Sequence, residues 1–291
     1  MNRIETNITK QSVGWWNSIK GADFDNDGDT DYVLGNLGLN SKYKASTQYP
    51  LQMRAADFDN NRTIDPLMGY ALVGKNGKNT IYPSPQREVM VAAMPQTRFI
   101  FNSYDLYADI GFDDFISKLK NKPVFSADVT ELRSVYLENK GKNNFLLRPL
   151  PTEAQIAPQF GMVIGDYNGD ENLDVLLVGN SYSADVITGR YDASYGVFLA
   201  GDGRGNFKTL KNTGFLVEGD CKGMVQLHDA KHNSIVIVGI NNAKMLAFKA
   251  SNYSYPNAPI PDKRYGWVKE KRKNGQFRKV ETYYGSGYLS Q

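Results

Sequence analysis

A nine-residue acidic pattern, D-x-[DN]-x-[DN]-x-x-x-D, occurs three times in this chain. The copies span residues 23–31 (loop one), 57–65 (loop two) and 166–174 (loop three). Loop one carries five carboxylates in nine residues, and unit charges about 4 Å apart repel by roughly 1 kcal/mol even in bulk water. Because a bound divalent cation removes that repulsion, the pattern predicts three cation-binding loops.

The ligand types indicate which cation the loops prefer. Side-chain oxygens alternate at positions 1, 3 and 5, position 7 offers a backbone carbonyl, and His and Cys are absent, which favours Ca²⁺ over zinc. An EF-hand needs Glu at position 12, where this chain has Leu34, Met68 and Leu177, so we expect position 9 to complete the shell. The expected ligands are Asp23, Asp25, Asp27, Asp29 and Asp31; Asp57, Asp59, Asn61, Thr63 and Asp65; and Asp166, Asn168, Asp170, Asn172 and Asp174.

Short runs of β character flank every loop. They precede the loops at 18–22, 52–56 and 161–165 and follow them at 32–35, 67–70 and 175–179. A glycine- and asparagine-rich turn between two further strands stands at 139–144 and 201–206, with a weaker version at 75–78. Strand, acidic loop, strand, connection, strand, glycine turn and strand make a four-stranded antiparallel unit. Its recurrence predicts an all-β fold, a β-propeller with about four visible blades.

These residues resemble the FG-GAP and VCBS repeats of integrin α-subunit propellers and of many bacterial secreted or surface proteins. Loop three is the nearest match, because Phe160-Gly161 opens its strand and Val178-Gly179-Asn180 stands where the family has Gly-Ala-Pro. The stretch 284–291 is similar to the start of the ASPIC and UnbV segment that follows such propellers in cartilage-acidic-protein-like and bacterial proteins. The resemblance implies a calcium-binding propeller and implies no reaction.

Two features depart from the repeat pattern. Position 6 is Arg62 in loop two and Glu171 in loop three, where a tight turn prefers glycine, so we expect left-handed backbone at both residues. A fourth unit at 223–248 has 228–233, with two histidines and one aspartate, in place of an acidic loop, and we expect it to hold no ion.

The repeats occupy residues 1–250, and an insertion at about 84–122 breaks their rhythm. Helices are predicted at 84–94, halted by Pro95, and at 112–119, where apolar residues recur at helical spacing. We expect these helices to pack across the face or rim of the propeller, where they would either shape a binding cleft or cover an exposed edge. Residues 251–291 form a C-terminal β segment.

Composition and charge argue against nucleic acid and membrane as partners. The net charge is +3, from 34 basic and 31 acidic residues, unlike the concentrated basic patch of a nucleic-acid binder. The basic cluster at 269–279 is expected to form the solvated face of a hairpin. Cys221 is expected to be a buried thiol. No apolar run reaches the roughly 18 residues that span a bilayer, so we expect no membrane insertion.

The sequence is compatible with two cellular locations. The N-terminus lacks a signal-peptide core, which favours the cytoplasm. Calcium loops of this kind suit millimolar Ca²⁺, which favours a part of a longer exported protein that is extracellular, at the cell surface or periplasmic. We prefer the second reading.

The connection 180–196 is a candidate ligand loop. It concentrates Asp185, Arg190, Tyr191, Asp192 and Tyr195, a composition that suits stacking and hydrogen bonding to a sugar or peptide. The alternative is an internally hydrogen-bonded loop in which Arg190 pairs with an aspartate.

Two functions are compatible with these features. The first is a non-catalytic calcium-binding β-propeller module, in which structural Ca²⁺ supports loops that bind a protein or glycan, with no catalytic residues assigned. The second is a polysaccharide lyase or hydrolase with acid/base groups in a central cleft. Its candidate residues are Asp105, Asp109, Asp113, Asp114, Arg190 and Asp192. We prefer the first, since a lyase needs a Lys, Tyr or His base near a carboxylate of the carbohydrate and the sequence shows no such grouping at a recognisable spacing.

Overall fold

The computed structural model describes residues 5–8, 12–229, 233–254, 267–271, 275 and 277–281. The chain divides into two compact units. Unit 1 comprises 1–9, 15–41 and 133–291, and unit 2 comprises 10–14 and 42–132. The insertion is therefore wider than the expected 84–122, because it includes strands of its own and loop two.

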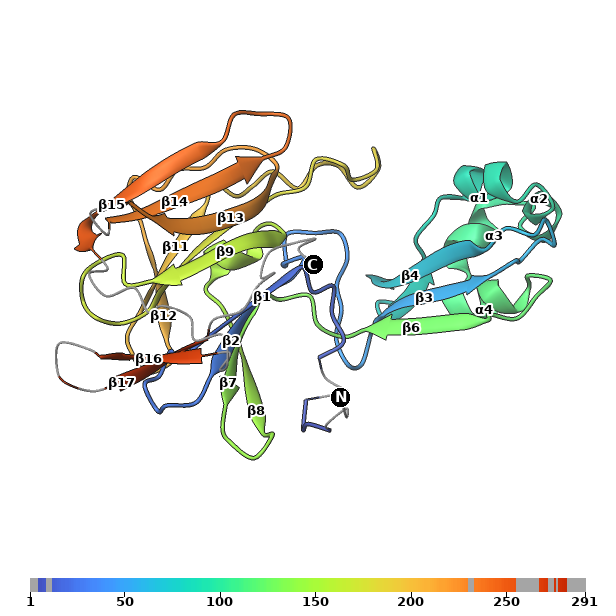
Figure 1. The fold of residues 1–291 in the computed structure, drawn as a ribbon. Helices are drawn as coiled ribbons and strands as arrows, with labels where there is room; N and C mark the ends of the chain where they lie inside the picture. Colours follow the sequence, from blue (N-terminus) through green and yellow to red (C-terminus); the bar gives the residue numbers. More distant parts are fainter. Residues whose placement is uncertain are drawn as a thin grey trace. The chain divides into compact units, whose positions relative to one another are not determined.

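Unit 1 contains two complete four-stranded antiparallel sheets (Figure 1). The first has the order β1 (Ser18–Ala22), β2 (Asp31–Gly35), β7 (Val135–Asn139) and β8 (Phe145–Pro149). The second has the order β9 (Gln159–Gly165), β10 (Asp174–Gly179), β11 (Val197–Gly201) and β12 (Phe207–Leu210), after the 3-10 helix Thr152–Gln155. In both, an acidic loop joins strands one and two and a glycine turn joins strands three and four, as predicted.

Two smaller sheets complete the described part of unit 1. β13 (Cys221–His228), β14 (Asn233–Ile240) and β15 (Leu246–Ser254) form the fourth predicted unit, and β16 (Trp267–Lys271) pairs with β17 (Phe277–Glu281). The predicted predominance of antiparallel β-structure is confirmed. Residues 230–232 and the ASPIC-like stretch 284–291 lie outside the described residues.

The sheets of unit 1 pack through their first strands, since β9 contacts both β1 and β13. β10, with the sequence DVLLVG, is buried along its whole length, so after Asp174 it is continuously apolar instead of alternating. Gly161 permits the approach of β9 to β13, because a Cβ there would lie 3.0 Å from the backbone nitrogen of Met224. Cys221 is a buried free thiol, as expected.

The β16–β17 hairpin differs from its prediction at one residue. Arg278 is only 4% exposed, whereas the sequence predicted a solvated face. Its guanidinium donates to Oε2 of Glu270 from Nη2 at 2.8 Å and from Nε at 3.1 Å. A buried guanidinium needs such a carboxylate partner.

Unit 2 is a four-stranded sheet with four short helices. Its order is β5 (Asn79–Pro83), β4 (Asp65–Val73), β3 (Leu51–Ala56) and β6 (Phe125–Val129). The helices are α1 (Arg87–Ala93), α2 (Thr97–Ile100), α3 (Tyr104–Asp109) and α4 (Phe112–Ser117). The two predicted helices are confirmed as α1 and α4, whereas α2 and α3 were not predicted.

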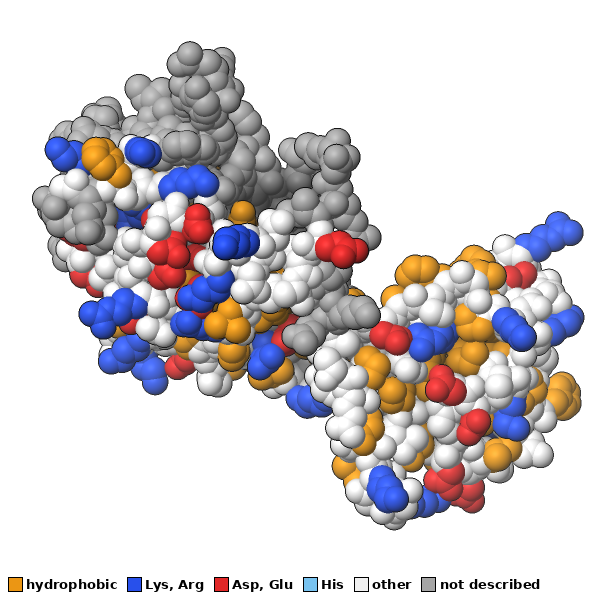
Figure 2. Space-filling view, turned by 90° about the horizontal axis from the view of Figure 1, so that it is seen from below, with side chains coloured by type: hydrophobic (Ala, Val, Ile, Leu, Met, Phe, Trp, Pro, Cys, Tyr) orange, Lys and Arg blue, Asp and Glu red, His pale blue; other side chains and the backbone are white. Residues whose placement is uncertain are grey.

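The helices pack within unit 2. They cover the sheet of their own unit through a core that includes Phe58 and Leu67 from the sheet side and Phe112 and Phe115 from α4. Phe101 stacks on Phe115 with ring centroids 4.9 Å apart. The inserted segment brings its own strands, so the apolar helix faces are buried locally. Hydrophobic side chains also gather on the face of unit 2 seen in Figure 2.

Candidate cation-binding loops

The three acidic loops share one backbone conformation. Each connects two directly paired antiparallel strands, β1–β2, β3–β4 and β9–β10. Positions 4 and 6 are left-handed in every loop. Their φ values are 62° and 92° at Asn26 and Gly28, 64° and 72° at Asn60 and Arg62, and 85° and 70° at Gly169 and Glu171. The predicted left-handed conformation of Arg62 and Glu171 is confirmed.

The side-chain oxygens of the loops are held by a repeated set of hydrogen bonds. The oxygen at position 5 accepts from the backbone nitrogen of position 7: Asp27 from Asp29 at 2.8 Å, Asn61 from Thr63 at 2.7 Å, and Asp170 from Asn172 at 2.8 Å. The oxygen at position 3 accepts from position 5: Asp25 from Asp27 at 3.3 Å, Asp59 from Asn61 at 3.1 Å, and Asn168 from Asp170 at 2.9 Å. One sequence pattern thus produces one local geometry.

Within the described residues, carboxylates converge in two of the loops. Side-chain oxygens of Asp23, Asp25 and Asp27, and likewise those of Asp57, Asp59 and Asp65, lie within 4.8 Å of one another. Loop three has Asn168 at position 3, whose Nδ2 donates to Oδ2 of Asp170 at 3.0 Å.

Loop one contains a buried carboxylate oxygen that has no hydrogen-bond partner in the described structure. This oxygen is Oδ1 of Asp23. Burial raises the pKa of the Asp23 carboxyl, and the charges of Asp27 and Asp25 raise it further. A buried, unpaired carboxylate oxygen is costly unless a cation or proton compensates it. An all-oxygen donor set of this charge fits Ca²⁺.

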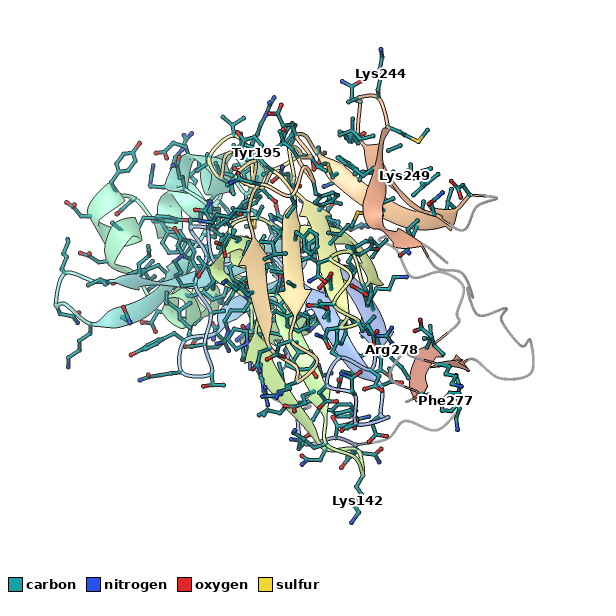
Figure 3. All side chains as sticks on the ribbon, turned by 90° about the vertical axis from the view of Figure 1, so that its left-hand side faces the viewer. Lys142, Tyr195, Lys244, Lys249, Phe277 and Arg278 are labelled. Atoms are coloured by element: carbon teal, nitrogen blue, oxygen red, sulfur yellow. The ribbon has the colours of Figure 1, made fainter. Side chains whose placement is uncertain are left out.

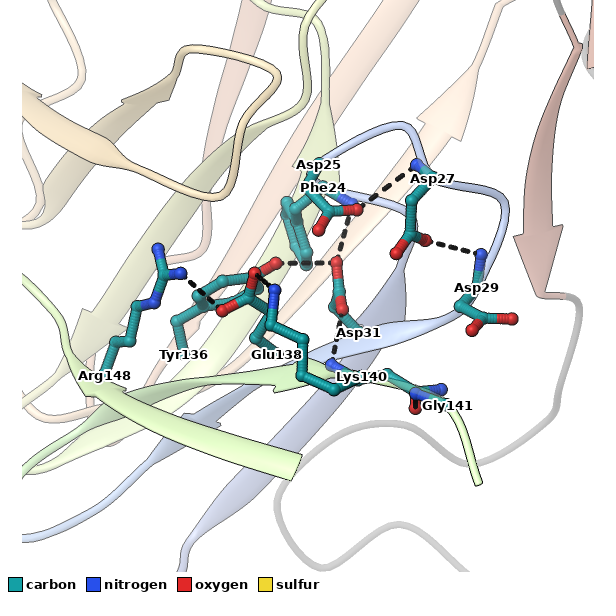
Figure 4. Close-up of polar contacts among 11 residues, drawn as sticks. Phe24, Asp25, Asp27, Asp29, Asp31, Tyr136, Glu138, Lys140, Gly141 and Arg148 are labelled. Atoms are coloured by element: carbon teal, nitrogen blue, oxygen red, sulfur yellow. Dashed lines mark hydrogen bonds and ion pairs between the residues drawn. The ribbon is translucent and has the colours of Figure 1, made fainter. Parts of the chain in front are cut away.

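Position 9 of loop one is held by hydrogen bonds to β7 and to its own loop. Both oxygens of Asp31 are already engaged: Oδ1 accepts from the backbone nitrogen of Asn139 at 2.8 Å, and Oδ2 from the Tyr136 hydroxyl at 2.7 Å and the Phe24 nitrogen at 3.2 Å (Figure 4). The residue is 0% exposed, and this burial raises its pKa to about 6. Asp31 ties its loop to β7 and does not join the carboxylate group of loop one.

Asp174 repeats this arrangement in loop three. Its Oδ2 accepts from the nitrogen of Tyr167 at 2.9 Å, and its Oδ1 accepts from the nitrogen of Gly201, at the end of β11, at 3.2 Å. Burial raises its pKa to about 7. Asn139 and Gly201 are the last residues of the third strand in their respective sheets.

Loop two lacks this tie to a third strand in its sheet. β5 pairs with β4 only as far as Gly69–Pro83, four residues beyond Asp65. Asp65 accepts from the nitrogen of Phe58 at 3.4 Å and remains partly exposed. Position 9 therefore joins the carboxylate group in loop two and not in loop one.

Sequence reasoning missed the residues that contact the loops from distant strands. Tyr136 and Asn139 lie more than 100 residues from Asp31, so no local spacing reveals them. Glu138, on the same strand, is 2% exposed and pairs with Lys140 and with Arg148, whose Nη2 lies 2.5 Å from its Oε2. One feature of the sequence could have pointed to them: Tyr136, Glu138 and Asn139 lie in or just before the predicted glycine turn at 139–144.

The candidate ligand loop at 180–196 lies at the other end of unit 1. Figure 3 places Tyr195, which precedes β11, opposite Lys142 of the β7–β8 glycine turn. Within the second sheet, antiparallel connectivity places the β10–β11 connection and loop three at opposite ends of β10.

Many polar groups of this connection are used internally. Asp185 accepts from the nitrogens of Ile187 and Thr188 at 2.8 and 3.0 Å, and Arg190 lies over the ring of Tyr182 at 5.1 Å. The Tyr191 hydroxyl lies 3.3 Å from Oγ of Ser41. Asp192 is exposed, as are Tyr195 at 54% and Val186 at 99%.

The residues considered for an enzyme are divided between the units. Asp105, Asp109, Asp113 and Asp114 are exposed on α3 and α4 of unit 2, and Asp109 pairs with Nζ of Lys75 at 2.7 Å. Arg190 and Asp192 belong to unit 1.

No family model matches this chain, and no curated protein matches it. None of the described helices has the length and apolar character that a membrane crossing requires.

Proposed function

We propose that this chain is a calcium-binding, non-catalytic module in which Ca²⁺ ions in the acidic loops stabilise the fold. The observation that carries the proposal is the buried, unpaired Oδ1 of Asp23 within a group of three carboxylates. The same backbone conformation in all three loops supports extending the assignment to loops two and three. The ions are structural, because each loop supplies its own oxygens.

The proposal includes a β-propeller arrangement for unit 1, of the FG-GAP and VCBS type. Two observations support it: sheets of the same strand order recur, and β9 contacts β1 and β13, the first strands of the neighbouring sheets. Blades around a common axis bring their first strands together in this way. Calcium loops of modest affinity suit an extracellular, cell-surface or periplasmic setting within an exported protein.

The proposed binding surface is the connection 180–196, which presents a protein- or glycan-binding face at the end opposite the calcium loops. Its exposed Tyr195, Asp192 and Val186 offer stacking, charge and apolar contact. Its internal hydrogen bonds keep it in one shape, which lowers the entropy that binding costs.

Calcium binding is tested by titration calorimetry and elemental analysis of the chain after chelation and dialysis against Ca²⁺. We expect up to three ions per chain, and loss of one ion in a variant with Asp25→Asn and Asp27→Asn. Mg²⁺ at the same concentration is the control, because it demands smaller octahedral sites. A chain that retains no Ca²⁺ under these conditions rules the proposal out.

The module and enzyme readings are separated by incubating the chain with a panel of polysaccharides. Retention in an affinity gel without product release supports a binding module, and loss of retention in Tyr195→Ala assigns it to 180–196. Released reducing ends or unsaturated sugars support a hydrolase or lyase instead.

A further inference from the structure

The glycine turn Gly201–Asn206, between β11 and β12, is held by both acidic loops of unit 1. The backbone nitrogen of Gly201 donates to Oδ1 of Asp174 in loop three at 3.2 Å. The backbone oxygen of Gly203 accepts from Nδ2 of Asn26 in loop one at 2.9 Å. One turn of the second sheet thus contacts a loop of its own sheet and a loop of the first sheet.

Packing around Gly203 leaves no spare room between the two loops. The residue has φ +69°, and a Cβ would lie 2.3 Å from Oδ1 of Asn172 and 2.8 Å from Nδ2 of Asn26. Asn172 is position 7 of loop three and Asn26 is position 4 of loop one. A shift of either side chain must therefore be accommodated by the turn.

A second set of contacts joins loop one to the far end of the same turn. The ring of Tyr136, whose hydroxyl donates to Asp31, packs edge-on against Phe24 and Phe207 with centroids 5.8 and 5.5 Å apart. Phe24 is position 2 of loop one, and Phe207 directly follows the turn. A Cβ at Gly205 would lie 2.9 Å from the Tyr136 ring, so the turn is pressed against this aromatic group.

We propose that Ca²⁺ binding at loop one and at loop three is positively coupled through the turn Gly201–Asn206. An ion in loop one fixes Asn26 and Phe24, and these hold the turn in the conformation that presents the Gly201 N–H to Asp174. The second ion then binds a loop whose ordering is partly complete, which is the source of positive cooperativity. The inference rests on the proposed calcium function and adds its regulation.

Loop two provides an internal comparison. Its position 4, Asn60, accepts from Nδ2 of Asn121 at 2.6 Å, within unit 2. Coupling through the turn should therefore leave loop two unaffected.

The test follows the amide resonances of Gly28, Gly169 and Asn60 in the isotope-labelled full chain during a Ca²⁺ titration, one reporter for each loop. Disabling loop one by Asp25→Asn and Asp27→Asn should weaken Ca²⁺ binding reported by Gly169 by about 5-fold or more, the lower end of typical coupling. Disabling loop three by Asp170→Asn should weaken the Gly28 response by the same factor, because linkage is reciprocal. Asp59→Asn in loop two is the matched control and should change neither.

Asn26→Gly tests the direct link with little perturbation of folding. Glycine adopts the left-handed conformation of this position and removes the amide that donates to Gly203. We expect loop one still to bind Ca²⁺ and the effect of loop one on Gly169 to shrink. Unchanged Gly169 affinity in the loop-one variant overturns the coupling and leaves the calcium function standing. Absence of any response at millimolar Ca²⁺ overturns both.

Discussion

At the scale of single residues, the aspartate at position 9 differs between the loops in its burial and in its hydrogen-bond partners. Asp31 and Asp174 are buried and accept backbone hydrogen bonds from a third strand, whereas Asp65 stays partly exposed among the carboxylates of loop two. The difference comes from the neighbouring strand, because only the two complete sheets of unit 1 bring a backbone N–H of a third strand to this carboxylate. Burial is the main cause of the raised pKa values of Asp31 and Asp174.

These two pKa values predict an unusual pH dependence for the calcium-free protein. Folding raises them from ordinary values near 4 to about 6 and about 7, so the native state binds more protons than the unfolded state in that window. Stability of unit 1 should therefore fall as pH rises from about 4 to 7, measured as the urea midpoint in chelator. Saturating Ca²⁺ should remove most of this slope, since the nearby ion favours the charged carboxylates. A calcium-free midpoint that rises steadily over this range would contradict the pKa assignment.

The left-handed Arg62 gives a second prediction at this scale. Its φ of 72° costs a residue with a Cβ roughly 1–2 kcal/mol of stability. Replacing it by glycine removes this cost, but about half of the gain is lost because glycine gives the unfolded chain more conformational freedom. Arg62→Gly should stabilise unit 2 by about 0.5–1 kcal/mol in urea unfolding followed by circular dichroism. Arg62→Ala is the control, because it removes the same exposed side chain and keeps the Cβ. An equal gain in the alanine variant would show that the side chain, and not the backbone, sets the cost.

At the scale of elements, the packing of sheet on sheet depends on positions where backbone approaches backbone. Gly161 on β9 faces the backbone of Gly223 and Met224 on β13, at 3.1 and 3.0 Å from the site of a Cβ. A methyl group at this position has to push two strands apart, and the core between them includes Val163, Val178 and Val236. Gly223 itself has open space beyond its Cα, with nothing within 4 Å of a Cβ.

This pair of glycines allows a matched test of the sheet packing. Gly161→Ala should destabilise unit 1 by roughly 1–3 kcal/mol, the usual cost of overpacking a core. Gly223→Ala should cost much less, because its methyl group meets no neighbour. Chemical unfolding monitored by tryptophan fluorescence compares the two variants in Ca²⁺. Equal losses would mean that β9 and β13 are not packed as described.

At the scale of the whole molecule, the sequence predicted the parts that depend on local spacing. The acidic loops, their flanking strands and the glycine turns follow from short patterns, and Arg62 and Glu171 have the conformation that position 6 requires. The pairing of β2 with β7 could not be predicted in this way, because 99 residues, most of them in unit 2, separate these strands and neither strand carries a mark of its partner. The role of Asp31 depends on that distant pairing, so it was missed with it.

The division into two units, each with its own core and at least one acidic loop, predicts two calcium-sensitive unfolding transitions. An ion at 100 times its Kd stabilises the native state by about 2.7 kcal/mol per site. For a domain the size of unit 2, each kcal/mol corresponds to roughly 4–8 °C in Tm. Differential scanning calorimetry of the full chain should show both transitions moving down in chelator. Asp57→Asn with Asp59→Asn should remove the calcium shift of unit 2 alone, because loop two is the acidic loop of that unit. If this variant abolishes the shift of both transitions, the two units unfold together and the calcium loops act through one cooperative structure.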